Sequence, residues 1–165
     1  MLLEQFNDAD RSDAVEVLRP CVDVQRWCEA VADARPYATR DDLLGLARTA
    51  AHPFTAAEVR TAMSHHPRIG EKPAGAGTEA VMSAAEQSGV DQTDATAAAD
   101  LRNGNRAYEE KFGRVFLIRA AGRSADEILS SLHTRLQNSP ETEDKVVAEQ
   151  LREIALSRLE GVITA

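Results

Sequence analysis

The sequence predicts an all-α protein, and three observations support this fold class. Aromatic residues make up only 4% of the 165 residues, while alanine is abundant. Apolar residues recur at intervals of three and four through most of the chain, which is the spacing of one helix face. Helix start and stop signals follow one another at short intervals. We therefore expect a single-domain multi-helix bundle over residues 1–165, with a short extended connecting segment near residues 114–121.

Helix starts are marked by a Ser or Thr three positions before an acidic residue. This pattern occurs in "TRDD" at 39–42, "TAAE" at 55–58 and "SADE" at 124–127. In each, the hydroxyl can accept an N–H of the first turn while the carboxylate reaches back to the cap. Ser139 followed by Pro140 predicts the start of a long last helix, because proline fits the first helical position.

Helix ends are predicted at prolines, since the residue before a proline is pushed out of helical geometry. We expect ends at Arg35-Pro36, His52-Pro53 and His66-Pro67. Gly113 predicts a further end, after "NRAYEEKF".

Two stretches are predicted to be non-helical. The run "RVFLIRAA", 114–121, is apolar and branched but too isolated to pair into a sheet, so we expect a buried connecting segment. The run "EKPAGAGTEA", 71–80, contains one proline and two glycines and predicts a mobile loop.

Charge and composition exclude several classes of function. The formal net charge of −8 argues against a nucleic-acid partner, which requires clustered Lys and Arg. No apolar run approaches the length of a membrane helix, so we expect no membrane partner. Cys21 and Cys28 lie seven residues apart in a helix-like stretch, on one face and too distant for a disulfide. Buried reduced thiols are the expected state.

Two adjacent histidines, His65 and His66, come directly before Pro67 in "AMSHHPRIGEK". We expect a helix that begins after Thr55 and ends at the histidines, where terminal carbonyls favour a protonated imidazole. Pro67 bends the residue before it out of the helix, so the ring of His66 should project into a cleft. The alternative is a histidine that only caps carbonyls. A metal site is disfavoured because the chain's four histidines lack the spacing of a zinc motif.

Two further groups of polar residues are candidate ligand contacts. Ser83, Glu86 and Gln87 share one face of the helix predicted around "TEAVMSAAEQSGV", which should end at Gly89. A solvated helix face is the alternative. Arg158, among apolar neighbours in "IALSRLEG", can grip an anion with its guanidinium or simply suit the end of a helix. Glu109, Glu110 and Lys111 are expected to form a solvated face.

The order of several runs resembles the OHCU decarboxylase family. The runs are "SHHPRIGEK", "SAAEQSGV", "NRAYEEKFGRVFLIRAAGRSADEIL", "RLQNSPETED" and "IALSRL", after an opening "FN", "RW" and "ARPY". The most specific pieces are His-Pro-Arg-Ile-Gly, Ser-x-x-Glu-Gln and Tyr-x-x-x-Phe-Gly, in that order. Two departures lie at Arg114, where the family commonly has an apolar residue, and in the "SGV" after Gln87.

The resemblance implies an all-helical single domain, usually a homodimer, that works without a cofactor or metal. Such a carboxy-lyase decarboxylates a small molecule, 2-oxo-4-hydroxy-4-carboxy-5-ureidoimidazoline, to (S)-allantoin and carbon dioxide in urate degradation. Urate oxidase and hydroxyisourate hydrolase are the implied pathway neighbours. The implied catalytic residues are His66 as acid/base, Glu86 and Arg158. The implied substrate-binding residues are Pro67, Ser83, Glu86, Gln87, Phe116, Leu117, Ile118, Arg119 and Ala120.

Other functions stay open on the sequence alone. One is a non-catalytic helical module that binds a purine breakdown product, and another is a structural interaction bundle. The final "ITA" is not a Ser-Lys-Leu type address, so we expect a bacterial cytoplasmic protein rather than a peroxisomal one.

Overall fold

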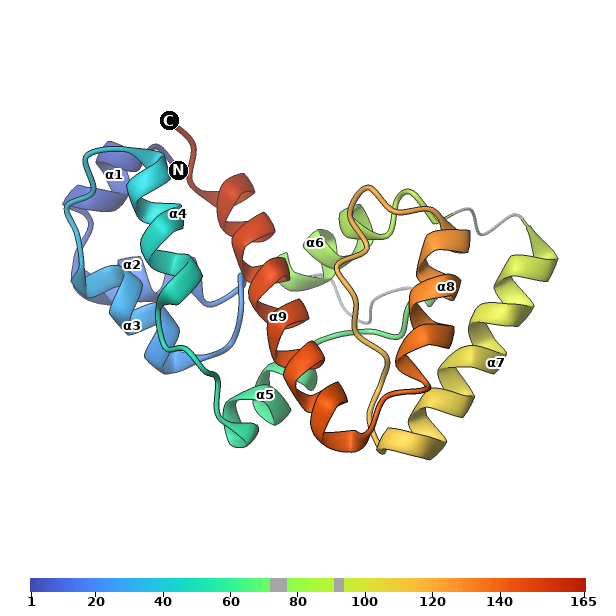
Figure 1. Ribbon diagram of the computed structural model, residues 1–165. Helices are drawn as coiled ribbons and strands as arrows, with labels where there is room; N and C mark the ends of the chain where they lie inside the picture. The colour runs from blue at the N-terminus through green and yellow to red at the C-terminus, as the bar shows by residue number, and fades with distance from the viewer. Residues whose placement is uncertain (72–76, 91–93) are drawn as a thin grey trace. The chain divides into compact units, whose positions relative to one another are not determined.

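The computed structural model describes residues 1–71, 77–90 and 94–165. In these ranges the backbone forms nine helices and no strand, apart from one isolated bridge between Leu2 and Thr164 (Figure 1). The all-α prediction is therefore confirmed. The helices are α1 Leu3–Asp8, α2 Arg11–Leu18, α3 Gln25–Asp33, α4 Arg40–Thr49, α5 Ala56–Met63, α6 Thr78–Glu86, α7 Ala95–Phe112, α8 Ala125–Arg135 and α9 Pro140–Val162.

The chain divides into two compact units. The first comprises Met1–Ser64 and Leu151–Ala165, and the second comprises His65–Gln150. Helix α9 contributes its first half to the second unit and its last half to the first. The boundaries of a single domain over residues 1–165 stay a prediction, and each unit is described by itself below.

The first unit packs α2 against α3 and α3 against α4 around a buried tryptophan. Trp27 has no solvent exposure, and its indole N–H donates to the carbonyl of Ala47 at 2.8 Å. The two ends of the chain meet here, because the amino group of Met1 donates to the carbonyl of Val162 at 2.9 Å. The interior is completed by buried aliphatic residues from α2, α4 and α9, among them Leu18, Leu43, Leu151 and Leu159.

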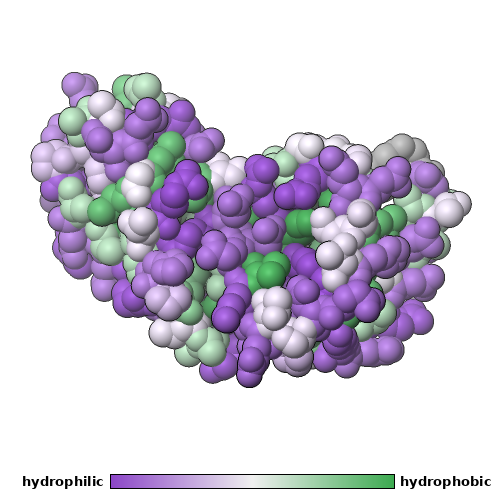
Figure 2. Space-filling model, in the orientation of Figure 1, coloured by the Kyte–Doolittle hydropathy of each residue, from purple (hydrophilic) through white to green (hydrophobic). Residues whose placement is uncertain are grey.

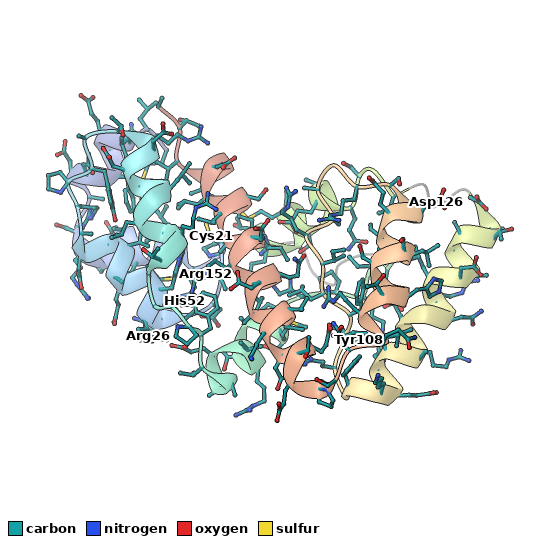
Figure 3. The ribbon with its side chains drawn as sticks, viewed as in Figure 1. Cys21, Arg26, His52, Tyr108, Asp126 and Arg152 are labelled. Atoms are coloured by element: carbon teal, nitrogen blue, oxygen red, sulfur yellow. The ribbon has the colours of Figure 1, made fainter. Side chains whose placement is uncertain are left out.

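Two arginines of the first unit fix the turn that follows α4. Arg152 is 5% exposed, donates to the carbonyl of Ala50 at 2.8 Å and places its guanidinium 4.2 Å from the ring centroid of Phe54. Arg26 donates to the carbonyl of Pro53 at 2.9 Å. Figure 3 shows Arg26, His52 and Arg152 in the same region of this unit. The basic side chains therefore satisfy carbonyls that no helix ladder reaches.

The second unit places α7 and α8 side by side (Figure 1). They enclose a buried cluster together with the chain that follows α7. Tyr108 lies at its centre, with its ring 4.7 Å from that of Phe112 and 5.1 Å from that of Phe116. The cluster comprises Ile69, Val90, Leu101, Tyr108, Phe116, Ile118, Ala120, Ile128, Leu129 and Leu132.

A fully buried carboxylate, Glu143 of α9, joins the elements of the second unit. Its Oε1 accepts from the hydroxyl of Tyr108 at 2.5 Å and from the guanidinium of Arg135 at 2.6 Å. Its Oε2 accepts from Asn138 at 2.8 Å. Arg135 also donates to the carbonyl of Leu117 at 2.6 Å. Because charge and hydrogen bonds are matched, this ion pair is tolerated in the interior.

The predicted helix starts and the predicted end at Gly113 are confirmed. Thr39, Thr55 and Ser124 each form a capping box with the acidic residue three positions on. α9 begins at Pro140. Gly113 ends α7 with φ +70°, in the left-handed region that suits glycine.

Residues 114–121 contain no helix and pair with no strand of the described chain. Within them Phe116, Leu117, Ile118 and Ala120 are buried. The prediction of a buried connecting segment is therefore confirmed.

Other boundary predictions are wrong. α3 ends at Asp33 and α4 at Thr49, two and three residues before the ends predicted at Arg35 and His52. The helix expected to end at the histidines ends at Met63, and the helix expected to reach Gly89 ends at Glu86. The chain tightens directly after both α5 and α6: the N–H of Ser64 bonds the carbonyl of Thr61, and the N–H of Ser88 bonds the carbonyl of Ala85, each three residues back. Cys21 lies in the turn between α2 and α3 rather than on one helix with Cys28.

Two other expectations concern the cysteines and the loop near residue 75. Both thiols are free and buried, as predicted, and burial raises the pKa of each to about 12. Residues 72–76 of the loop predicted over 71–80 lie outside the described residues, and its last three residues, 78–80, are helical.

Hydrophilic residues predominate on the visible surface of each unit (Figure 2). Across the described ranges, none of the helices has both the length and the apolar character that a membrane crossing requires.

We expect Glu143→Gln to lower the free energy of unfolding by about 3 kcal/mol, because it leaves the buried charge of Arg135 uncompensated. Tyr108→Phe should cost only about 1 kcal/mol, the value of one hydrogen bond. Urea unfolding measures both, with Glu141→Gln as the control, since Glu141 is exposed on the same helix. A loss for Glu143→Gln equal to that of the control would contradict this account of the second unit.

The first unit should lose stability in acid through Glu58. Its hydrogen bonds from Arg26, and then from Thr55, lower the pKa of its carboxyl from 4.5 to about 2. Because the folded-state pKa is depressed, the ionised Glu58 carboxylate contributes its full stabilisation above pH 4.5, and this stabilisation is lost as the pH falls towards 2. The free energy of unfolding of the wild type should therefore exceed that of Glu58→Gln by about 1 kcal/mol at pH 6, and the two should be nearly equal near pH 2. Urea unfolding at a series of pH values measures the difference. A gap that stays constant with pH would contradict the assignment.

Candidate functional site

The two histidines stand in different surroundings just after α5. The helix closes at Ser64, whose N–H and hydroxyl both donate to the carbonyl of Thr61, at 3.2 and 2.7 Å. His65 is exposed, and its Nδ1 lies 3.6 Å from a carboxylate oxygen of Glu79. His66 is partly buried and lies outside any helix. His66 lies outside the helix, as expected, but α5 already ends at Met63, so His65 lies outside it as well. That Pro67 is what separates His66 from the helix stays a prediction.

A tight turn follows His66 and Pro67. The N–H of Glu71 donates to the carbonyl of Arg68 at 3.1 Å, and Gly70 has φ +87°, which residues with a Cβ rarely adopt. The N–H of Gly70 donates to Oε1 of Gln87 at 2.9 Å. The turn that follows His66 and Pro67 is therefore bonded to the residue that caps α6.

Two side chains of α7 hold the same turn. Arg68 forms a two-pronged ion pair with Glu109, at 2.5 and 3.0 Å. Nδ2 of Asn105 donates to the carbonyl of Ile69 at 2.9 Å, in a buried position. The expectation that Glu109 belongs to a solvated face is therefore wrong. Glu110 and Lys111 are exposed, as expected, and the ammonium of Lys111 donates to two carbonyls after α8.

The polar residues near the end of α6 do not form a solvated face. Ser83 is 3% exposed and Gln87 is 7% exposed, while Glu86 is partly buried. Such burial is unusual for these residue types unless they have partners. The simple alternative of a water-facing helix side is therefore wrong for Ser83 and Gln87.

The connecting segment after α7 presents its backbone in a buried setting. The carbonyl of Leu117 accepts from Arg135 at 2.6 Å, and the N–H of Arg119 donates to Gln150 at 2.8 Å. These two backbone groups are engaged within the protein. Which groups of Phe116, Ile118 and Ala120 face a ligand stays a prediction.

Arg158 belongs to the first unit, unlike the other candidate residues. It is 6% exposed, and its guanidinium donates to the carbonyl of Pro20 at 3.0 Å. It also lies close enough to Cys21 to oppose the rise in that thiol's pKa that burial causes. That Arg158 belongs to the same site as His66 stays a prediction.

Several residues that shape the second unit escaped the sequence analysis. Asn105 is 4% exposed in the middle of α7, and Arg135 and Glu143 form the buried ion pair. A usable signal was the spacing of Leu101, Asn105 and Glu109, which puts a polar residue on the apolar side of a helix. In the described part of the chain, no three His, Cys, Asp or Glu residues are grouped as metal ligands would be.

The fold and this arrangement define an all-helical protein with a histidine-bearing turn that is held by polar side chains. The chain belongs to the OHCU decarboxylase family, whose pattern it matches over residues 7–160. A solved structure of an OHCU decarboxylase in the presence of (S)-allantoin has a TM-score of 0.71 and 25% identity, and the match covers 93% of this chain and 98% of that one.

The similar proteins with described functions fall into two groups: some are about as long as this chain, and others are about three times as long. A 2-oxo-4-hydroxy-4-carboxy-5-ureidoimidazoline decarboxylase of Amia calva is 29% identical over 99% of this chain and 95% of its own. A uric acid degradation bifunctional protein of Bacillus sp. (strain TB-90) is 24% identical over 98% of this chain and 32% of its own. One from Arabidopsis thaliana is 36% identical over 59% of this chain and 31% of its own. The chain thus spans about a third of the length of these bifunctional relatives.

The bond between Gly70 and Gln87 is open to a direct test. We expect Gln87→Leu to speed hydrogen exchange of the Gly70 amide by about 10-fold or more, since the amide loses its acceptor, a bond worth roughly 1 kcal/mol or more. Gln87→Glu keeps an acceptor oxygen and should retain most of the protection. NMR exchange rates give the comparison, with Ser88→Ala at the exposed next position as the control. Unchanged exchange in Gln87→Leu would show that this bond does not hold the turn.

Proposed function

We propose that this chain decarboxylates 2-oxo-4-hydroxy-4-carboxy-5-ureidoimidazoline to (S)-allantoin and carbon dioxide in urate degradation, as a carboxy-lyase. The observation that carries the proposal is the hydrogen bond between Gly70 and Gln87. It joins the His-Pro-Arg-Ile-Gly run to the Ser-x-x-Glu-Gln run, two stretches of a family whose pattern spans most of the chain. The names of the relatives agree with this activity.

The reaction is within reach of ordinary side chains. When the bond from the ring carbon to the carboxylate breaks, its electron pair stays on a carbon next to an imine, and the ring takes up that charge. The carbon that lost the carboxylate becomes a carbonyl as its hydroxyl gives up a proton, and a proton delivered to one face of the neighbouring ureido-bearing carbon sets the S configuration. The protein has to orient the substrate and move protons, and orientation alone is worth a large part of a barrier.

His66 is the proposed acid/base. Its imidazole either takes the proton of the substrate hydroxyl or returns a proton to carbon, and help of this kind is typically worth about 10² to 10⁴ in rate. Its position supports the role, because His66 is partly buried whereas His65 is exposed beside Glu79. Pro67 would line the same pocket.

Ser83, Glu86 and Gln87 are proposed to hold the ureidoimidazoline ring and its ureido group. The burial of Ser83 and Gln87 supports a recognition role, since buried polar groups discriminate strongly between ligands. Oε1 of Gln87 accepts from Gly70, so its NH₂ group is the part that we expect to donate to the substrate. Backbone groups of residues 116–120 would complete the recognition.

Arg158 is the proposed anchor for the polar side of the substrate. Its guanidinium suits a carboxylate. Gripping the departing carboxylate too tightly would stabilise the substrate more than the transition state and slow the reaction. We therefore assign Arg158 to orientation.

The remaining proposals concern the setting of the enzyme. We propose a homodimer in a bacterial cytoplasm, and the free thiols of Cys21 and Cys28 fit the cytoplasmic setting. The substrate would be supplied by an oxidation of urate and a ring hydrolysis, the reactions of urate oxidase and hydroxyisourate hydrolase. No cofactor is required by the proposed chemistry.

The test makes the unstable substrate in place from urate with those two enzymes and follows circular dichroism. Spontaneous decay gives racemic allantoin, so only the protein should produce a growing signal of (S)-allantoin. We expect His66→Asn to lower this rate by about 10² or more while the melting temperature holds. His65→Asn is the matched control and should keep most of the rate.

Full activity in His66→Asn would contradict the role of His66. Absence of any signal from the wild type would contradict the proposed reaction. In that case a rise of melting temperature with (S)-allantoin would identify a binding module instead.

A further inference from the structure

We propose that one face of α7, formed by Leu101, Asn105 and Glu109, positions His66 for the proposed reaction. This inference rests on the proposed function and adds positioning residues to it. The three residues are spaced four apart, so they follow one another along a single side of the helix. Each of them meets the turn that follows His66 and Pro67.

The turn is held at consecutive residues. Arg68 pairs with Glu109 at 2.5 and 3.0 Å, and the carbonyl of Ile69 accepts from Asn105 at 2.9 Å. Side-chain atoms of Leu101 lie against Gly70, since a Cβ on Gly70 would be 3.7 Å from a methyl of Leu101. Three positions in a row are therefore fixed to one helix.

His66 has little freedom relative to this anchored turn. Pro67 is the only residue between His66 and Arg68, and its ring fixes φ near −65°. A shift of the turn along α7 therefore moves the backbone of His66 by a similar amount. Misplacement of about 1 Å at a reacting group is enough to cost roughly 10²-fold in rate.

The chemistry of Asn105 favours positioning over stability. Its Nδ2 donates to Ile69, but its Oδ1 is buried without a hydrogen-bond partner among the described residues. The reverse orientation of the amide would set oxygen against the carbonyl of Ile69. A buried acceptor without a partner costs stability. Asn105 thus stabilises the protein less than its burial suggests. Its main effect is to orient the carbonyl of Ile69 through the hydrogen bond from Nδ2.

Glu109 complements Asn105 at the exposed edge of the turn. The fork of the Arg68 guanidinium matches both carboxylate oxygens, which fixes an angle as well as a distance. The pair is partly exposed, with side-chain exposures of 46% for Arg68 and 26% for Glu109. Its contribution should therefore be smaller than that of Asn105.

The experiment compares Asn105→Leu with Asn103→Leu, the same substitution at an exposed position of α7. We expect Asn105→Leu to lower kcat for (S)-allantoin formation by about 10- to 100-fold. KM should change by less than about 3-fold, because the proposed substrate contacts of Ser83 and Gln87 are untouched. Asn103→Leu should keep both constants. Glu109→Gln should lower kcat by a smaller factor, with Glu110→Gln as its control.

A second readout does not depend on the reaction. The imidazole signals of His66 in the proton NMR spectrum, assigned by their loss in His66→Asn, should shift in Asn105→Leu and stay in place in Asn103→Leu. A purely structural role would alter melting temperature and leave folded His66 unmoved. If both kcat and the His66 signals of folded Asn105→Leu match those of Asn103→Leu, the inference is overturned. If the wild type makes no (S)-allantoin but the His66 signals shift as expected, the proposed function fails and the positioning stands.

Discussion

A carboxylate with no solvent exposure, Glu143, ties together the unit that carries His66. It accepts hydrogen bonds from Tyr108 of α7 and Arg135 of α8 while it belongs to α9. Arg135 in turn holds the carbonyl of Leu117. The three helices and the connecting segment therefore take their mutual positions from one buried charge. Because an unpaired charge is very costly in the interior, few other arrangements of these elements are tolerated.

The candidate site depends on this arrangement indirectly, through helix α7. Tyr108 fixes α7 through Glu143, and the same helix presents Asn105 and Glu109 to the turn after His66. From the other side, Gln87 accepts from Gly70 of that turn. The catalytic histidine proposed here thus stands on a loop whose geometry is set by helices. A functional site often keeps polar residues, such as Asn105, that add little to the stability of the fold.

Local sequence signals were sufficient for much of the fold. The capping boxes at Thr39, Thr55 and Ser124 depend on residues three apart, so a reader of the sequence sees both partners. Gly113 ends α7 because a left-handed residue is needed there. The exact ends near His65 and Gln87 were missed, since the final turn tightens through bonds to carbonyls that compete with the regular ladder.

The candidate site was only partly predictable. His66 became a candidate because Pro67 is adjacent, and Ser83 and Gln87 because a helix face can be counted from spacing. Their proposed roles came from the family resemblance. The partnership of Asn105 with Ile69 joins residues 36 apart, and that of Arg135 with Glu143 joins different helices. Pairs between different elements depend on packing, which periodicity does not encode. Glu109 was misread for the same reason, because its partner Arg68 is 41 residues away.

The central claim is that the turn after His66 and the buried end of α6 form one recognition surface for a ureidoimidazoline-derived ligand. Titration with (S)-allantoin and, separately, (R)-allantoin, followed through backbone amide NMR signals, tests it most directly. We expect the S form to shift the signals of Gly70, Ser83 and Gln87 at lower concentration than the R form does. Equal responses to both enantiomers, or shifts confined to other parts of the chain, would contradict it.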